Sequence, residues 1–205
     1  MHASRADGGW RPPTASDLRY LTRLRVLPAR VASFQWRARR LATRTGDSFS
    51  LVSATRPADL ATLLRLARDR RRVVELGTGT GWTAIALALL DTDREVITYD
   101  PIHRPERERY LALAPSRVRG QITFVNEPGA VGPRGQRAID LLYVDSAHGR
   151  QDTIDELNAW QPALAAGATV VLDDFTHPEF PGVREAVLEL GLEGTQEGTL
   201  FVCAT

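Results

Sequence analysis

The stretch RRRVVELGTGTGWTAIALALL, residues 70–90, joins an apolar run, a glycine-rich turn and a helical pattern. The run VVEL predicts a buried strand, and the apolar residues after the turn predict a helix. Glycines between a strand and a helix let the backbone turn sharply and approach a ligand closely. This order of elements is typical of folds that bind a nucleotide, so we expect a nucleotide-like cofactor at residues 77–81.

The chain beyond this stretch continues to alternate between strand-like and helical segments. Strands are expected at residues 73–76, 95–100, 122–125, 139–145, 169–174 and 200–204, and helices at 81–91, 105–113, 148–164 and 181–190. Apolar strands separated by helices are typical of a mainly parallel sheet that is covered on both faces. We therefore expect an α/β, Rossmann-like fold with six or seven strands, in which the last strand pairs with the residues after Gly191.

The sequence before residue 70 has a different character. Residues 1–13 carry glycine, proline and charge, and they predict a loose tail. Pro28 is expected to split the helical pattern that follows the tail, and Pro57 to open another helix. We expect residues 1–69 to form a tail and a helical lid, and residues 70–205 to form one compact catalytic domain that binds the cofactor.

The composition excludes several classes of protein. All 26 basic residues are arginine, which excludes the P-loop lysine, Schiff-base chemistry and the Tyr-Lys pair of short-chain reductases. The formal net charge of +1 argues against a nucleic-acid partner. The single cysteine excludes an internal disulfide. With no signal peptide and no apolar run of about 20 residues for a membrane span, we expect a cytoplasmic protein with a small-molecule partner, and a homo-oligomer stays compatible.

The glycine turn favours one cofactor over others. Gly77, Gly79 and Gly81 follow the spacing Gly-x-Gly-x-Gly rather than Gly-x-Gly-x-x-Gly, and Glu75 precedes them. A carboxylate beside an anionic pyrophosphate is costly, whereas S-adenosylmethionine carries an ammonium and a sulfonium that a carboxylate favours. The turn therefore favours S-adenosylmethionine, the alternative being a tight turn beside a surface glutamate.

Other residues extend this predicted cofactor site. Asp100 ends the second strand, 19 residues after the last glycine of the turn. A carboxylate there accepts hydrogen bonds from both ribose hydroxyls of an adenosine, and it disfavours a 2′-phosphate. Thr78 and Trp82 at the turn, with Asn126 and Glu127 after the third strand, complete the expected cofactor-binding set.

Three carboxylates follow two later strands. Asp145 closes the strand at 139–145, and Asp173 and Asp174 close the strand at 169–174. Neighbouring strands lie about 4.8 Å apart, so these carboxylates would converge and repel one another unless a cation were present. A hard divalent ion such as Mg²⁺ suits oxygen ligands, and it would hold and acidify a substrate hydroxyl. The alternative is that one of the paired aspartates caps a loop or a helix.

A histidine lies beside this predicted metal site. His148 follows Asp145 by three residues. A neutral imidazole near pH 7 is suited to take the proton of an attacking hydroxyl, so we expect His148 and Asp145 to be catalytic. His177 is the weaker candidate for the base.

Four segments together carry a family resemblance: VVELGTGTGWTAIALAL, ITYDP, IDLLYVDSAH and GATVVLDDFTHPEFPGVREAV. They resemble class I S-adenosylmethionine-dependent methyltransferases, in particular a small bacterial group similar to macrolide-sugar O-methyltransferases and cephalosporin-biosynthesis methyltransferase-like proteins. The resemblance covers residues 70–205. It implies a Rossmann-like methyltransferase fold and O-methylation of a small molecule with a divalent metal.

The resemblance also bears on single residues. Catechol-type relatives use a lysine as base, three residues after a metal-binding aspartate, and His148 stands at that position. The family shows a Gly-Asp-Ser-like segment near the adenine, whereas this chain has NEPG at residues 126–129. Two alternatives stay open, a nicotinamide-dependent oxidoreductase and a non-catalytic cofactor-binding protein. The glycine spacing, Glu75 and the lack of lysine count against the first, and the acidic set with His148 against the second.

Overall fold

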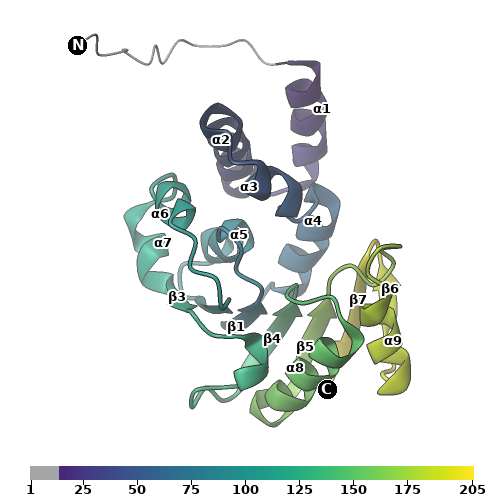
Figure 1. The fold of residues 1–205 in the computed structure, drawn as a ribbon. Helices are drawn as coiled ribbons and strands as arrows, with labels where there is room; N and C mark the ends of the chain where they lie inside the picture. The colour runs from purple at the N-terminus through teal and green to yellow at the C-terminus, as the bar shows by residue number, and fades with distance from the viewer. Residues whose placement is uncertain (1–13) are drawn as a thin grey trace, which may run out of the picture.

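The computed structural model describes residues 14–205, so the tail expected at residues 1–13 lies outside the described residues. Within them the chain forms one seven-stranded sheet of order β3-β2-β1-β4-β5-β7-β6 (Figure 1). The strands are β1 (Arg72–Leu76), β2 (Glu95–Tyr99), β3 (Ile122–Val125), β4 (Ile139–Val144), β5 (Leu164–Leu172), β6 (Thr195–Glu197) and β7 (Leu200–Ala204). β1 to β5 pair in parallel, and β7 runs antiparallel to both of its neighbours. The expected parallel sheet and the pairing of the last strand are confirmed.

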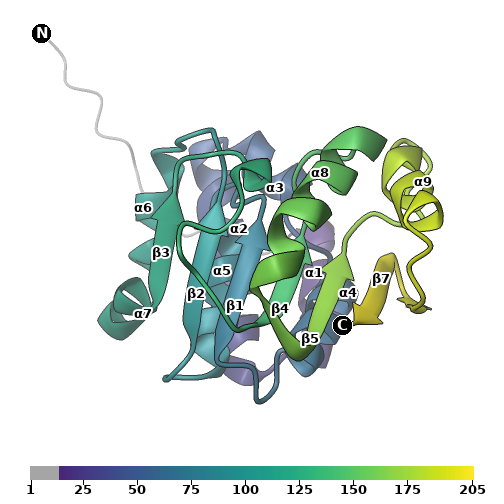
Figure 2. The ribbon, with the colours of Figure 1, turned by 90° about the horizontal axis from the view of Figure 1, so that it is seen from below.

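Helices cover both faces of this sheet. They are α1 (Ala15–Arg23), α2 (Ala29–Thr45), α3 (Ser48–Ser53), α4 (Pro57–Leu66), α5 (Trp82–Leu90), α6 (Glu106–Leu111), α7 (Ser116–Gln121), α8 (Arg150–Trp160) and α9 (Pro181–Glu189), with 3-10 turns η1 (Leu24–Val26), η2 (Gly129–Val131) and η3 (Gln161–Ala163). Figure 2 shows α8 in front of the sheet, with α5 and the N-terminal helices behind it. As expected, Pro28 separates two helices and Pro57 opens α4.

The core has two layers because successive residues of a strand point to opposite faces of the sheet. Val73 of β1 packs among the residues of α2, α4 and α5, whereas Val74 packs with Trp160 of α8 and Val183 of α9. Both valines are fully buried. The sheet is therefore covered by apolar side chains on both faces, and its polar groups concentrate where the strands end.

The N-terminal helices pack on the α5 side of the sheet, and of these helices α3 reaches the cavity at the carboxyl ends of the strands. α2 contacts α5 and ends at Gly46, whose φ of 69° is the left-handed conformation that glycine favours at a helix end. Asp47 then caps α3 by accepting a hydrogen bond from the backbone N–H of Ser50 at 3.0 Å. The Ser50 hydroxyl lies 2.8 Å from the Thr80 hydroxyl, which ties α3 to the glycine turn. Among residues 14–205, no helix combines the length and apolar character needed to cross a membrane.

Candidate active site

A cavity of about 750 Å³ opens at the carboxyl ends of the central strands. Its wall includes the glycine turn, Asp100, Asp145, His148, Asp173 and Asp174, together with residues of α3 and Phe180. Ligands of open α/β sheets bind at this end, where the strand order reverses, and here that reversal falls between β1 and β4. The structure thus brings most of the predicted site residues to one cavity.

The glycine turn is packed directly against the end of β4. A Cβ atom at Gly77 would lie 1.8 Å from the carbonyl oxygen of Asp145, and Gly77 also has a φ of 101°. Gly81, with a φ of 83°, turns the chain into α5. No side chain fits at Gly77, so the turn that is expected to bind the cofactor shares a backbone contact with the strand that carries Asp145.

Glu75 lies beneath the turn and is not among the residues that line the cavity. It is 1% exposed and accepts a hydrogen bond from the Thr98 hydroxyl at 2.5 Å. Thr98 in turn lies 2.6 Å from the hydroxyl of Thr78. Burial raises the pKa of Glu75 to about 8. Glu75 is therefore connected to the cavity only through the hydroxyls of Thr98 and Thr78. Trp82, at the start of α5, lines the cavity directly.

Asp100 is held by three groups. Its carboxylate accepts hydrogen bonds from the backbone N–H groups of Gly79 and Ile102, both at 2.8 Å, and lies 3.3 Å from the guanidinium of Arg107. Arg107 is 4% exposed and also donates to the carbonyls of Gly79 and Ile102. The sequence carried no motif that points to Arg107, which fixes the carboxylate at the end of β2 and the glycine turn together.

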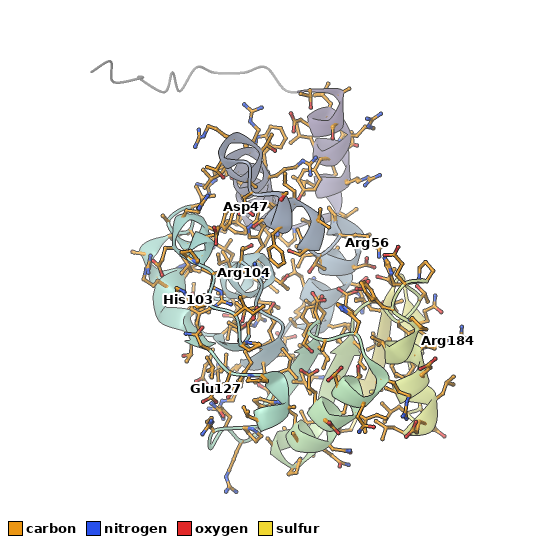
Figure 3. All side chains as sticks on the ribbon, viewed as in Figure 1. Asp47, Arg56, His103, Arg104, Glu127 and Arg184 are labelled. Atoms are coloured by element: carbon orange, nitrogen blue, oxygen red, sulfur yellow. The ribbon has the colours of Figure 1, made fainter. Side chains whose placement is uncertain are left out.

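The two residues after β3 lie elsewhere than the sequence suggests. The side-chain oxygen of Asn126 accepts a hydrogen bond from Arg107 at 3.2 Å. Glu127 is half-buried and pairs with Arg134, and Figure 3 shows it apart from Arg56 and Arg104, at the lower left of the view. Neither Asn126 nor Glu127 is among the residues that line the cavity.

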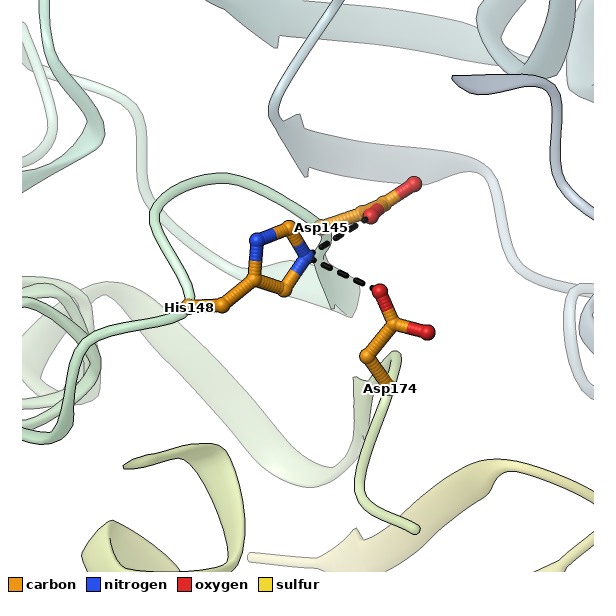
Figure 4. Close-up of side chains that lie close together, drawn as sticks. All are labelled: Asp145, His148 and Asp174. Carbon is orange, nitrogen blue, oxygen red and sulfur yellow. Dashed lines mark ion pairs between the residues drawn. The ribbon is translucent and has the colours of Figure 1, made fainter. Parts of the chain in front are cut away.

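The acidic residues converge because β4 and β5 are neighbours, with Val144 paired to Leu172. The Nε2 atom of His148 lies 3.0 Å from Asp174 and 3.7 Å from Asp145, between their two carboxylates (Figure 4). One ligand atom from each of these residues lies within 4.8 Å of the others. We call these three residues, Asp145, His148 and Asp174, the acidic cluster.

Asp173 lines the same cavity as Asp145 and Asp174, but it is not one of the three residues of the acidic cluster. Its carboxylate accepts hydrogen bonds from the Tyr143 hydroxyl at 2.5 Å and from the backbone N–H of Asp174 at 2.7 Å. Asp174 has a φ of 55°, a left-handed conformation that aspartate tolerates better than most residues. The chain therefore changes direction directly after β5, and the two consecutive carboxylates face different partners.

The close carboxylates shift the pKa values of the acidic cluster. Contacts with Asp145 and Asp174 raise the pKa of His148 to about 9, because both carboxylates stabilise the imidazolium. Burial, together with the charge of Asp173, raises the pKa of Asp145 to about 7. In this arrangement His148 carries a proton at neutral pH, which differs from the neutral imidazole that the sequence suggests.

Aromatic and arginine side chains complete the wall. Phe180 stacks on His148 with ring centroids 4.2 Å apart and on His177 at 4.7 Å, so it fixes the plane of the His148 ring. The guanidinium of Arg104 lies 3.5 Å from the ring centre of Phe49 on α3. Phe49 and Arg104 were not predicted as site residues, although Asp47, just before the apolar residues of α3, is of a type that starts helices.

The family described as "Methyltransferase domain" matches residues 74–175 of this chain. The match runs from β1 to the segment after β5, so it includes the glycine turn, Asp100 and the acidic cluster. No curated protein gives a significant match.

Solved structures share the fold. The O-methyltransferase TomG from Streptomyces achromogenes, involved in tomaymycin synthesis, is 24% identical with a TM-score of 0.58, over 74% of this chain and 82% of that chain. A methyltransferase from Geobacter sulfurreducens is 19% identical with a TM-score of 0.64, over 95% and 98%. CalS11, a TDP-rhamnose 3′-O-methyltransferase of calicheamicin biosynthesis, is 19% identical with a TM-score of 0.57, over 99% of both chains. This chain therefore contains a methyltransferase domain at residues 74–175, and it has the fold of the solved methyltransferases.

Proposed function

We propose that this chain transfers the methyl group of S-adenosylmethionine to a hydroxyl of a small-molecule acceptor. One observation carries the proposal: the glycine turn and the acidic cluster open into the same cavity and are joined by the contact between Gly77 and Asp145. A methyl donor on the turn would therefore face groups that can bind and deprotonate an acceptor. The O-methyltransferases TomG and CalS11, which share the fold, act in natural-product synthesis, and this supports a small-molecule acceptor.

The cofactor would lie along the glycine turn, with its ribose hydroxyls on Asp100. Asp100 lines the cavity, and its carboxylate is already fixed by the backbone of Gly79 and by Arg107. A carboxylate that is held in place loses little freedom when it binds a ligand, which favours affinity. The negative charge of this carboxylate also disfavours a ligand that carries a 2′-phosphate.

In the chemical step the acceptor oxygen attacks the methyl carbon of the sulfonium. A carbon–oxygen bond forms, the carbon–sulfur bond breaks with its electron pair passing to sulfur, and the hydroxyl proton must leave. Asp145 and His148 lie where they can receive that proton, and His148 can do so only after it has released its own. Phe180 holds the His148 ring in the plane that faces Asp174.

The residues of the acidic cluster fit a divalent cation such as Mg²⁺. Two carboxylates and an imidazole nitrogen converge, and the buried Nε2 of His148 has no well-aligned hydrogen-bond partner among the described residues although Asp174 lies close. Asp145 and Asp174 would hold the cation, with His148 or Asp173 as the third ligand. A bound cation would supply positive charge that lowers the pKa of an acceptor hydroxyl.

Calorimetry tests the cofactor and radiolabel transfer tests the reaction. We expect S-adenosylhomocysteine to bind and NAD⁺ not to bind under the same conditions. Labelled methyl from S-adenosylmethionine should then appear on members of a panel of sugar, nucleotide-sugar and phenolic hydroxyl compounds. Asp145→Asn should bind the cofactor but lose transfer, and the exposed Asp155→Asn should keep both. Binding of NAD⁺ without S-adenosylhomocysteine would contradict the proposal.

A further inference from the structure

Glu156 is a buried carboxyl group on α8 that the proposed reaction does not use. It is 4% exposed, it lines the cavity, and its Oε2 atom accepts a hydrogen bond from the Ser146 hydroxyl at 2.5 Å. Within residues 14–205 its Oε1 atom has no hydrogen-bond donor. An acceptor atom without a donor on the wall of a cavity is suited to a ligand that supplies one.

The wall beside Glu156 is shaped around this carboxyl group. A Cβ atom at Gly129 would lie 2.4 Å from Oε1 of Glu156, so only glycine leaves space for the carboxyl at its present position. Gly129 has no left-handed backbone conformation that would by itself call for glycine. Its carbonyl accepts a hydrogen bond from the Trp160 indole at 2.8 Å, which fixes the segment after β3 against α8.

Glu156 lies where the adenine end of the proposed cofactor would be. The backbone N–H of Asp100 donates to the carbonyl of Val125 at 3.0 Å, so the segment after β3 begins beside the carboxylate that would bind the ribose. The methyl group must face the acidic cluster, on the other side of the glycine turn. The adenine attached to the ribose would then lie against the part of the cavity wall formed by Ile102, Gly129 and Glu156.

We propose that Oε1 of Glu156 accepts a hydrogen bond from the exocyclic amino group of the adenine, and that Glu156 thereby selects adenine over other purines. This inference rests on the proposed function. A 6-oxo purine would place a second acceptor oxygen against Oε1, and two acceptors without a donor repel each other. Asn126 and Glu127 do not line the cavity, so α8 supplies the polar group that the segment after β3 does not.

The test compares S-adenosylhomocysteine with its 6-oxo analogue, S-inosylhomocysteine, by calorimetry. At pH 8, above the pKa of about 7 to which burial raises the Glu156 carboxyl group, the parent protein should bind the amino compound about 10- to 100-fold more tightly, the range for a hydrogen bond to a charged group. In Glu156→Gln the side-chain amide can donate to the 6-oxo group, so the preference should fall at least tenfold. Glu185→Gln on the exposed face of α9 is the matched control and should keep the preference of the parent.

The outcomes separate this inference from the proposed function. If the parent does not bind S-adenosylhomocysteine, the proposed function and this inference both fail. If the parent binds it but shows no preference for the amino compound, or if a folded Glu156→Gln keeps the full preference, only the inference is overturned. If Glu156→Gln does not fold, Glu156→Asp takes its place and should also lose most of the preference, because its shorter side chain withdraws the carboxylate from the adenine.

Discussion

Arg107 and neighbouring backbone N–H groups hold the carboxylate of Asp100 in a fixed position. Arg107 donates to two backbone carbonyls and lies beside the Asp100 carboxylate, while Asn126 holds Arg107 from the other side. A buried arginine with this many acceptors has little freedom to move. The position of the proposed ribose site is therefore fixed by Arg107 and Asn126, neither of which lines the cavity.

The first prediction concerns Asp100. Asp100→Asn keeps an oxygen for the N–H of Gly79 but cannot accept from two ribose hydroxyls as a carboxylate does. We expect the affinity for S-adenosylhomocysteine to fall by about 1.5–3 kcal/mol, the range for hydrogen bonds to a charged group. Calorimetry measures this, with the exposed Asp93→Asn as control. Unchanged affinity in Asp100→Asn would remove the ribose role.

The second prediction concerns the base. His148→Ala should lower kcat by about 10²–10⁴, the usual worth of general-base catalysis, with almost no change in cofactor affinity. His177→Ala should cost less, because the contacts of His177 are to Phe180 and to the backbone of Glu179 rather than to the acidic cluster. If His177→Ala is inactive and His148→Ala is not, the two roles must be exchanged.

The third prediction separates two possible ligand sets for a cation. Asp174→Asn should abolish the binding of Mn²⁺, used as a paramagnetic probe of the Mg²⁺ site, because Asp174 belongs to the acidic cluster. Asp173→Asn should weaken Mn²⁺ binding less, because the Asp173 carboxylate is already occupied by Tyr143. Electron paramagnetic resonance gives both affinities, and Asp155→Asn serves as the exposed control. Full transfer activity in excess EDTA would mean that the cluster works without a cation.

At the scale of elements, the strands were predictable, whereas two of the short helices, α3 and α7, were not. Long apolar runs such as IDLLYV in β4 have a clear period, whereas α3 and α7 have six residues each, too few for a helical period to show. β5 begins at Leu164 rather than at the expected residue 169. The earlier start was not predicted because alanine and glycine, which are depleted in strands, follow Leu164. The element that covers the cavity, α3, was thus missed for a physical reason.

Arg94 joins three elements at the other end of the sheet, and the fourth prediction rests on it. It is 2% exposed and donates to the carbonyls of Ala67 after α4, Leu87 in α5 and Arg70 before β1. Arg94→Met would leave three carbonyls without their donor, so we expect the free energy of unfolding to fall by about 2–4 kcal/mol. Urea denaturation measures this, and the exposed Arg68→Met should have almost no effect.

On the scale of the whole molecule, the rule for parallel sheets predicted correctly that residues from several strand ends gather around one cavity. It places the ends of β1, β2, β4 and β5 at one edge, and Asp100, Asp145 and Asp174 do line one cavity there. The rule says nothing of where a side chain points once the strand has ended. The separation of Asp173 from Asp174, and the roles of Arg107 and Glu156, therefore appear only in the structure.

The fifth prediction is a fall in stability as the pH rises. Burial raises the pKa of Glu75 to about 8 and that of Glu156 to about 7, and neighbouring carboxylates raise that of His148 to about 9. Each group binds more protons in the folded than in the unfolded chain, the carboxyl groups above their unfolded pKa of 4.5 and His148 above 6.5. The free energy of unfolding should therefore decrease between about pH 4.5 and pH 9, by on the order of a few kcal/mol.

Denaturation at a series of pH values measures this slope. Glu75→Gln should flatten the part of the slope between about pH 4.5 and 8, since the amide cannot ionise. Glu185→Gln should leave the slope unchanged, because Glu185 is exposed. A stability that rises with pH over this range would show that Glu75 is not desolvated as the structure has it.

The contact between Gly77 and the carbonyl of Asp145 has a consequence for how such an enzyme can diversify. Because that contact is made by backbone atoms, the spacing between the proposed position of the methyl donor and the acidic cluster cannot be altered by exchanging side chains. By contrast, α3 is tied to the glycine turn through a pair of hydroxyls, Ser50 and Thr80. New acceptors can therefore be acquired by substitution in α3 and in the segment around Phe180, while the geometry of the transfer is inherited unchanged.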